Sequence, residues 1–384
     1  MRRMRSLTAL LALWAGLLGI TGVGPAAHAE PRAPLAAGLH IANGRLLEGN
    51  GNDFVMRGVN HAHTWYPGET QSLGDIKALG ANTVRVVLSN GHRWTRNSPE
   101  DVASIIAQCK ADRLICVLEV HDTTGYGEEA AAASLDQAAD YWIGLKSVLA
   151  GQEDYVVINI GNEPWGNTDP EGWTAPTVAA VQKLRGAGFQ HTLMVDAPNW
   201  GQDWQGVMRA NAQTVYKADT TGNLIFSIHM YSVYDTAQEI TGYLNVFVDA
   251  KLPLLIGEFG GPADQWGDPD ENTMMATAER LRLGYLAWSW SGNTDPILDM
   301  TVDFDPARLT DWGKRVFNGP DGIAATSREA TVYGGGSGAA CSVGYRVVGE
   351  WSGGFQGEMA IRNTGTAPVS GWNACATGQA LASK

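Results

Sequence analysis

Two glutamates stand alone at the ends of apolar segments. Glu163 follows the apolar run 155–160, and Glu258 follows the run 254–257. An unpaired charge is costly to bury, so a core segment has no structural reason to end in a lone carboxylate. Two carboxylates about 5–5.5 Å apart can cleave a glycosidic bond with retention, because one protonates the leaving oxygen while the other attacks the anomeric carbon. The pair predicts this chemistry if the fold brings the two side chains face to face.

Other polar and aromatic residues lie at the ends of further apolar segments. Arg85 could hold one glutamate ionised, and Tyr231 could donate a hydrogen bond to it. His121 and His229 could contact a substrate or could only satisfy hydrogen bonds of the fold. Trp288 could form a floor on which a sugar ring stacks. The surroundings must also separate the pKa values of the two glutamates, since one is protonated when the other is ionised.

Eight short β-type runs alternate with helical patterns such as 99–112, 134–149 and 177–187. The runs are Phe54–Val59, Thr83–Leu88, Leu114–Val120, Tyr155–Ile160, Thr192–Asp196, Leu224–Met230, Leu254–Gly257 and Leu283–Trp288. This alternation predicts an α/β fold, the (β/α)8 TIM barrel, whose active site lies at the carboxyl ends of the strands. Strands four and seven lie on opposite sides of such a ring, so Glu163 and Glu258 would face each other. An open doubly wound sheet is the competing fold, but no G-x-G-x-x-G follows a strand and no Walker A motif is present.

The composition changes after the predicted barrel. We expect the catalytic domain at residues 30–328, a Gly-rich linker at 329–339 and an all-β module at 340–384. Short strands are predicted at Val343–Val348 and Glu358–Arg362. The segment is short for an independent β-sandwich, which usually needs about 100 residues. The sequence therefore predicts an incomplete β module.

The first residues have the pattern of a signal peptide. Arginines at positions 2, 3 and 5 precede the uncharged run 7–20, and Ala27-His28-Ala29 matches a cleavage site. We expect residues 1–29 to be removed and the protein to be secreted. The net charge of −13 disfavours nucleic acid and anionic membranes as partners and favours a monomer. The 14 tryptophans favour a surface that stacks on flat rings such as sugars.

An exported protein can form disulfides, and the chain contains four cysteines. The simplest of the three pairings joins Cys109 to Cys116 and Cys341 to Cys375. If Ile115 points into the barrel, Cys116 points toward the preceding helix, which carries Cys109. The second pairing is doubtful because the sequence around Cys375 does not read as a strand.

Two other classes of protein can be built on a similar barrel. A metal-dependent hydrolase could use His61-Ala62-His63, but the predicted strands lack the further ligands that such a site needs. A sugar-binding protein without catalysis would gain little from two facing carboxylates. Neither a metal nor a cofactor is expected, because the two-carboxylate mechanism requires none. We interpret Glu119 as a buried carboxylate with a structural partner.

Taken together, these segments resemble glycoside hydrolase family 5, over roughly residues 38–318. The matching motifs are Asn-Thr-Val-Arg85, Leu-Glu-Val-His121-Asp, Asn162-Glu163-Pro, His229-Met-Tyr231, Ile-Gly-Glu258-Phe-Gly-Gly and Leu-Ala-Trp288-Ser-Trp. The segments around Trp65 and Trp94, and the segment Ser291-Gly-Asn293, are similar more narrowly to secreted bacterial endo-β-1,4-mannanases. A cellulase of the same family, an endo-β-1,4-glucanase, is the alternative, because the catalytic residues are shared.

The resemblance implies a role for each matching residue. Glu163 would be the acid/base, Glu258 the nucleophile, and Asn162 a partner of the sugar 2-hydroxyl. Arg85 and Tyr231 would orient Glu258. Contacts with the substrate would come from His121, His229, Trp288 and, at a neighbouring subsite, Trp65. The expected substrates are mannan, galactomannan and glucomannan.

The C-terminal segment resembles the first part of a family 2 carbohydrate-binding module. The similarity lies in Cys341-Ser-Val-Gly-Tyr, Trp351-Ser-Gly-Gly-Phe and Ile361-Arg-Asn-Thr-Gly, and it is lost after Trp372. By position, Trp351 matches the flat row of tryptophans with which such modules bind cellulose or xylan. Most of that row is missing, so we expect this segment neither to fold fully nor to bind cellulose well.

Overall fold

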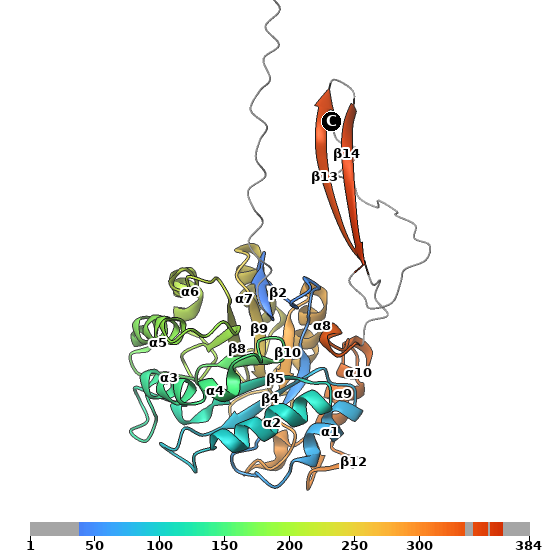
Figure 1. The fold of residues 1–384 in the computed structure, drawn as a ribbon. Coiled ribbons are helices and arrows are strands. Elements are labelled where there is room, and N and C mark those ends of the chain that lie inside the picture. The colour runs from blue at the N-terminus through green and yellow to red at the C-terminus, as the bar shows by residue number, and fades with distance from the viewer. Residues whose placement is uncertain (1–37, 335–340, 352–353, 364–384) are drawn as a thin grey trace, which may run out of the picture. The chain divides into compact units, whose positions relative to one another are not determined.

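A closed barrel of eight parallel strands forms the centre of the fold in the computed structural model, which describes residues 38–334, 341–351 and 354–363 (Figure 1). The strands pair in sequence order, and the last pairs with the first. They are β3 (Arg57–His61), β4 (Thr83–Leu88), β5 (Ile115–Val120), β6 (Val156–Asn159), β7 (Leu193–Asp196), β8 (Leu224–Met230), β9 (Leu254–Phe259) and β10 (Gly284–Ala287). The predicted (β/α)8 barrel is confirmed, and each predicted run lies within three residues of a strand at both ends.

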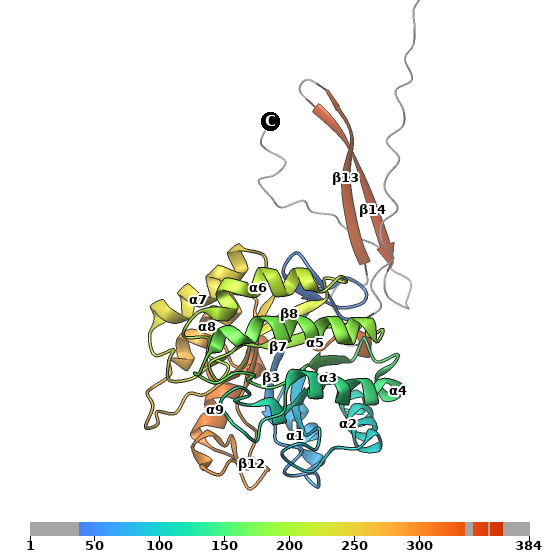
Figure 2. The ribbon, with the colours of Figure 1, turned by 90° about the vertical axis from the view of Figure 1, so that its left-hand side faces the viewer.

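Helices cover the outside of the barrel (Figure 2). They are α1 (Gln71–Ala78), α2 (Pro99–Ala111), α3 (Leu135–Gly144), α4 (Lys146–Leu149), α5 (Thr174–Gly186), α6 (Val207–Ala218), α7 (Ala237–Asp249), α8 (Glu271–Leu281), α9 (Asp311–Asn318) and α10 (Ile323–Thr326). Short 3-10 turns lie at His121–Thr123, Pro170–Trp173, Pro296–Leu298 and Thr331–Tyr333. Side-chain caps fix where two of the helices begin. The Ser98 side chain caps α2, and Ser134 forms a capping box with Gln137 at α3. The predicted helix 134–149 is two helices that meet at Leu145.

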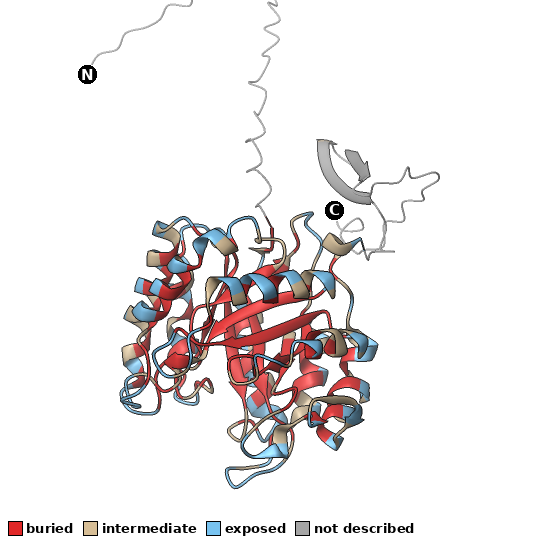
Figure 3. Ribbon diagram, turned by 60° about the horizontal axis from the view of Figure 1, so that its bottom comes forward, coloured by how far each residue is buried: buried red, intermediate tan, exposed pale blue. Residues whose placement is uncertain are grey.

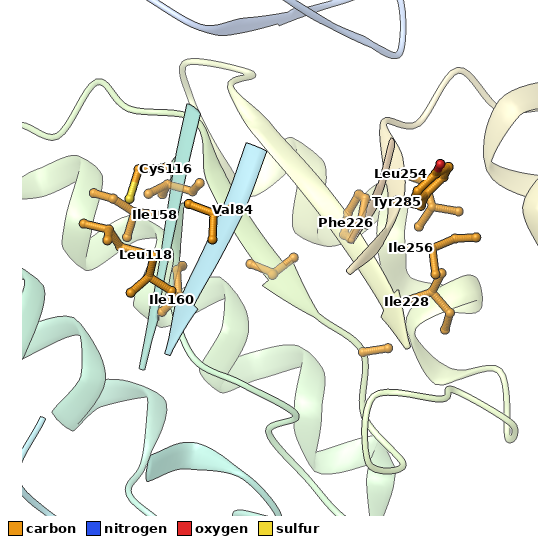
Figure 4. Packing of buried hydrophobic residues seen from close by; sticks show 14 of the residues in the cluster. Val84, Cys116, Leu118, Ile158, Ile160, Phe226, Ile228, Leu254, Ile256 and Tyr285 are labelled. Carbon is orange, nitrogen blue, oxygen red and sulfur yellow. The ribbon is translucent and has the colours of Figure 1, made fainter. Parts of the chain in front are cut away.

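Alternate residues of each strand face two different environments. On β5, Cys116 and Leu118 pack in the cluster between strands and helices, whereas Ile115 and Val117 pack in a second cluster inside the barrel. Figure 4 shows residues of the outer cluster, and Figure 3 shows that the strands are buried while the helices expose one face. Near the carboxyl ends the inward positions change from apolar to polar, as at Glu119. Polar side chains that could take part in a reaction therefore gather at the carboxyl ends of the strands.

Besides the barrel strands, the described residues form three antiparallel hairpins. The pair β1 (His40–Ala42) and β2 (Arg45–Leu47) contributes Leu46 to the inner apolar cluster and covers the amino ends of the strands. A second pair, β11 (Thr301–Val302) and β12 (Asp305–Leu309), follows β10. In the C-terminal segment, β13 (Cys341–Trp351) and β14 (Gly354–Asn363) form the third hairpin and contain the two strands predicted there.

The predicted disulfide between Cys109 and Cys116 is corrected by the structure. The two side chains are hydrogen-bonded neighbours, as the strand orientation required, but both are free, buried thiols. Burial raises the pKa of Cys116, and a thiol that stays protonated is a poor partner for oxidation. The side chain of Cys341 and all of Cys375 lie outside the described residues, as does the predicted signal peptide. None of the helices in the described ranges is long and apolar enough to cross a membrane.

Candidate active site

The predicted site residues meet at the carboxyl ends of the barrel strands. Arg85 is on β4, His229 on β8 and Glu258 on β9, and all three side chains are buried. Glu163 lies four residues beyond the end of β6 and adopts a left-handed backbone conformation, with φ of 39°. A non-glycine residue in this region is strained, and such strain is concentrated at functional sites.

A register shift turns Glu258 toward the centre of the barrel. On β9, Leu254 and Ile256 belong to the outer cluster and Leu255 to the inner one, so strict alternation would turn Glu258 outward. The pairing with β8 slips between Ile228 and His229, so Ile228 faces Ile256 and His229 faces Glu258. Gly257 is the extra residue of this bulge. A Cβ at that position would lie 2.0 Å from Ser227 Oγ, so beside the Ser227 hydroxyl only glycine avoids a collision.

The two glutamates approach each other across His229. Glu163 Oε1 lies 2.7 Å from His229 Nδ1, and Glu258 Oε2 lies 3.5 Å from the same nitrogen. One oxygen of each glutamate and one ring nitrogen of His229 all lie within 4.8 Å of one another. Such a spacing suits direct attack on a sugar, whereas inverting enzymes separate their carboxyl groups by about 6.5–9.5 Å to admit a water molecule.

Arg85 and Tyr231 hold the two oxygens of Glu258. Arg85 Nη1 donates to Oε1 at 2.7 Å, and the Tyr231 hydroxyl donates to Oε2 at 2.8 Å. Arg85 Nη2 also donates to Asn162 Oδ1 at 2.7 Å, which fixes the residue before Glu163. The structure therefore brings together both contacts that were expected from the residue types.

Aromatic rings form one wall beside these charges. The His121 ring stacks on Trp288 with a centroid separation of 5.7 Å and an interplanar angle of 24°. Trp65 meets His121 edge-on at 5.1 Å and Trp94 at 5.2 Å. Trp288 is only half-buried, and its Nε1 donates to Asn293 at 2.9 Å. Contacts among the rings thus hold the wall in place, and the exposed part of Trp288 is free to stack on a flat ligand.

The charges of the site stabilise one another. Burial opposes the positive charge of His229, but Glu258 and Asp196 outweigh it and raise the pKa of His229 to about 10. Burial likewise opposes the charge of His121, which Glu119 outweighs, so the pKa of His121 is raised. Burial raises the pKa of Glu258, and the charges of His229 and Arg85 oppose that shift. Attack on a substrate by one carboxylate, with proton donation to the leaving group by the other, is the chemistry that this arrangement allows.

Glu163, His229 and Glu258 also have the spacing of three metal ligands. A histidine ligates through a deprotonated nitrogen, whereas the raised pKa of His229 keeps its Nδ1 protonated beside Glu163. The His61-x-His63 pair offers no second centre, because His63 Nε2 contacts Asp101 of α2 at 3.1 Å. These donor sets fit a hydrogen-bonded site better than a metal site.

Two buried carboxylates complete the site without having been selected from the sequence. Asp196 ends β7 and lies 3.1 Å from Arg85 Nη2. Glu119, interpreted as a paired structural carboxylate, lies 2.8 Å from His121 Nδ1 and 3.8 Å from Arg85. The sequence does contain a signal for Asp196, because this residue ends a strand, as the other site residues do. It is the last, polar residue in a row of side chains that face the inside of the barrel.

Comparisons with known proteins give a consistent result. A family model described as "Cellulase (glycosyl hydrolase family 5)" matches residues 47–294, and one described as "Cellulose binding domain" matches residues 341–380. The chain is 60% identical to the "Mannan endo-1,4-beta-mannosidase" of Streptomyces lividans over 318 residues, 82% of each chain. It is 50% identical to the protein of the same name from Cellvibrio japonicus, covering 80% of this chain and 72% of that one.

A solved structure is similar over the same region. It is the crystal structure of a beta-mannanase from Streptomyces thermolilacinus with mannohexaose, at 78% identity and a TM-score of 0.77. The match covers 78% of this chain and 99% of that one.

Proposed function

The chain belongs to glycoside hydrolase family 5, and from this premise we propose that it is a secreted, retaining endo-β-1,4-mannanase. It would hydrolyse internal β-1,4-mannosidic bonds in mannans, galactomannans and glucomannans. The observation that carries the proposal is the pair Glu163 and Glu258, with oxygens within 4.8 Å, in a chain that is 60% identical to a mannan endo-1,4-beta-mannosidase.

Double displacement follows from the positions of the two glutamates. Glu258 attacks the anomeric carbon, and Glu163 gives its proton to the departing glycosidic oxygen, so a covalent mannosyl-enzyme forms. Glu163 then removes a proton from water, which attacks the anomeric carbon and releases Glu258. Two inversions give net retention.

The neighbours of Glu258 support its role as the nucleophile. Arg85 and Tyr231 each hold one of its oxygens, so the attacking oxygen is fixed and its charge is stabilised. Glu163 is in contact with His229 and is partly exposed, as suits a group that exchanges protons with substrate and water.

Substrate contacts follow from the remaining groups. Asn162 uses its Oδ1 for Arg85 and one amide hydrogen for Thr124, which leaves the second hydrogen for the sugar 2-hydroxyl. Trp288 is the floor of the subsite where cleavage occurs, and His121 lines it. Trp65, which meets His121 edge-on, extends the aromatic wall toward the next sugar.

An endo-β-1,4-glucanase is the second candidate. The description of the matching family model is "Cellulase", and the C-terminal match is to a cellulose-binding domain. Mannose and glucose differ only in the orientation of the 2-hydroxyl, and the catalytic groups serve both sugars.

A comparison of two polymers separates the candidates. We expect release of reducing sugar from locust bean gum and little from carboxymethyl cellulose, with the activity lost in Glu258→Ala. Glu100→Gln, which changes an exposed glutamate on the outer helix α2, is the control and should retain activity. Cleavage of the cellulose derivative alone would replace the substrate assignment. Wild-type activity in Glu258→Ala would refute the two-carboxylate mechanism, and an α-anomer as first product in proton NMR would refute retention.

A further inference from the structure

Asp196 lies behind the catalytic pair, where no sugar can reach it. Its side chain is completely buried at the end of β7. Oδ2 accepts hydrogen bonds from Arg85 Nη2 at 3.1 Å and from the backbone N–H of Glu163 at 3.3 Å. Oδ1 accepts a hydrogen bond from Asn159 Nδ2 at 2.9 Å. One carboxylate thus contacts the backbone of the acid/base and the arginine that holds the nucleophile.

Asp196 also faces His229 from the side opposite the glutamates. Its Oδ2 lies 3.3 Å from His229 Nε2, an ion-pair contact, and that nitrogen makes no aligned hydrogen bond to any described residue. The other ring nitrogen, Nδ1, faces Glu163 and Glu258. The ring therefore lies between one carboxylate behind and two in front, with Arg85 shared among Asp196, Glu258 and, at 3.8 Å, Glu119.

We propose that Asp196 is a positioning residue that keeps both nitrogens of the His229 ring protonated and fixes the backbone of Glu163. This inference rests on the proposed function, since it assigns a role in the same reaction. The imidazolium then donates from Nδ1 to Glu163 and opposes the rise that burial causes in the pKa of Glu258, because a positive charge within a few ångströms favours the ionised carboxylate. Consistent with this role, burial would raise the pKa of Asp196 itself, but His229 and Arg85 outweigh it and lower that pKa to about 2.

An asparagine at this position cannot replace the carboxylate. All the neighbours of both carboxylate oxygens are N–H groups, so the NH2 of the introduced amide would face a donor in either orientation. The amide oxygen then takes the Oδ2 position, which faces three N–H groups, and the NH2 faces Asn159. The negative charge that favours the second proton of His229 is lost in this arrangement. His229 becomes neutral and keeps a single proton on Nδ1.

The pH dependence of Asp196→Asn tests the charge. Without the imidazolium Glu258 loses a nearby positive charge and its pKa rises, so the acidic limb of the kcat/KM profile should move to higher pH, by about one unit. We expect kcat at the optimum to fall at least about tenfold while KM changes little, because Asp196 touches no sugar. Asp196→Glu, which keeps the charge, should restore the position of the acidic limb in part.

A matched control removes another buried, paired carboxylate. Asp219 accepts two hydrogen bonds from Arg185, each 2.9 Å long, at the end of α6. Asp219→Asn should lower thermal stability and leave the limbs of the profile in place. If Asp196→Asn behaves in the same way, the residue is only structural and the proposal is wrong.

Nitrogen NMR of the histidine ring gives a readout that needs no substrate. We expect both nitrogens of His229 to be protonated at pH 7 in the wild type and one in Asp196→Asn, with the signal assigned from His229→Gln. Identical spectra in the two proteins would overturn the proposal. If the wild type cleaves neither polymer the proposed function fails, and the spectra still decide whether Asp196 sets the charge of His229.

Discussion

At the residue scale, Arg85 uses all five of its N–H donors inside the barrel. The acceptors are Asn60, Asn159, Asn162, Asp196 and Glu258, at distances between 2.7 and 3.1 Å. A guanidinium has five donors in a fixed plane, so its orientation is determined completely by these partners. Glu258, the proposed nucleophile, therefore receives a fixed donor on one oxygen, and its other oxygen depends on Tyr231.

Removal of the Tyr231 hydroxyl isolates this second contact. Tyr231→Phe should lower kcat about 10- to 100-fold, the value of one hydrogen bond to a charged group. It should also move the acidic limb of the kcat/KM profile upward, because Glu258 loses a donor that stabilises its ionised form. Steady-state kinetics over a range of pH measures both effects.

Tyr234→Phe is the control for this substitution. In the wild type, the Tyr234 hydroxyl donates to the Gln202 carbonyl at 2.8 Å and contacts neither glutamate. We expect its kcat and acidic limb to match the wild type. An equal decrease in both variants would mean that the Tyr231 hydroxyl matters for packing and not for Glu258.

At the element scale, the bulge in β9 decides which way Glu258 points. Gly257 allows the two strands to slip by one residue, since its missing Cβ leaves room for Ser227. Ser227 Oγ has no hydrogen-bond partner among the described residues, so its hydroxyl can be removed at little cost. The position is therefore suited to a pair of compensating substitutions.

Gly257→Ala should destabilise the protein by about 1–3 kcal/mol, as overpacking of a core does. It should also lower kcat strongly, because β9 must move and Glu258 moves with it. Ser227→Ala alone should resemble the wild type. The double variant should recover part of both losses, since the contact at 2.0 Å disappears and the next, to the Cβ of residue 227, is 3.2 Å. Thermal unfolding and kcat are measured for the wild type, the two single variants and the double variant, and they show whether the two substitutions are coupled. Additive effects would contradict this account of the bulge.

The elements themselves could be predicted, but the bulge could not. Eight apolar runs separated by helical patterns are visible in the sequence, because strands of a parallel barrel are buried on both faces. A period of two that starts at Leu255 gives Gly257 the inward position and Glu258 the outward one. Glu258 was selected only because site residues gather at the strand ends. Asp196 was missed although it ends a strand as the selected residues do, because its type and position do not show that Arg85 and His229 lie beside it. The disulfide was predicted wrongly because spacing shows proximity but not oxidation state.

At the scale of the whole molecule, the candidate active site and the C-terminal hairpin lie in different parts of the described chain. The paired glutamates and the aromatic wall all lie between β3 and the loop that follows β10. The C-terminal segment contributes the hairpin β13–β14, where Trp351 is 61% exposed. A two-stranded hairpin is at best marginally stable in water without further strands.

A chain that ends at Gly334 tests this division. It keeps every residue assigned to the site, so we expect kcat/KM on soluble galactomannan within about twofold of the full chain, a difference below about 0.5 kcal/mol. Both proteins should remain mainly in solution when mixed with crystalline cellulose, because binding to a flat crystal face needs several aligned rings. Sedimentation with cellulose measures this directly. Strong retention of the full chain, lost in the shorter one and in Trp351→Ala, would show instead that the C-terminal segment is a working binding module.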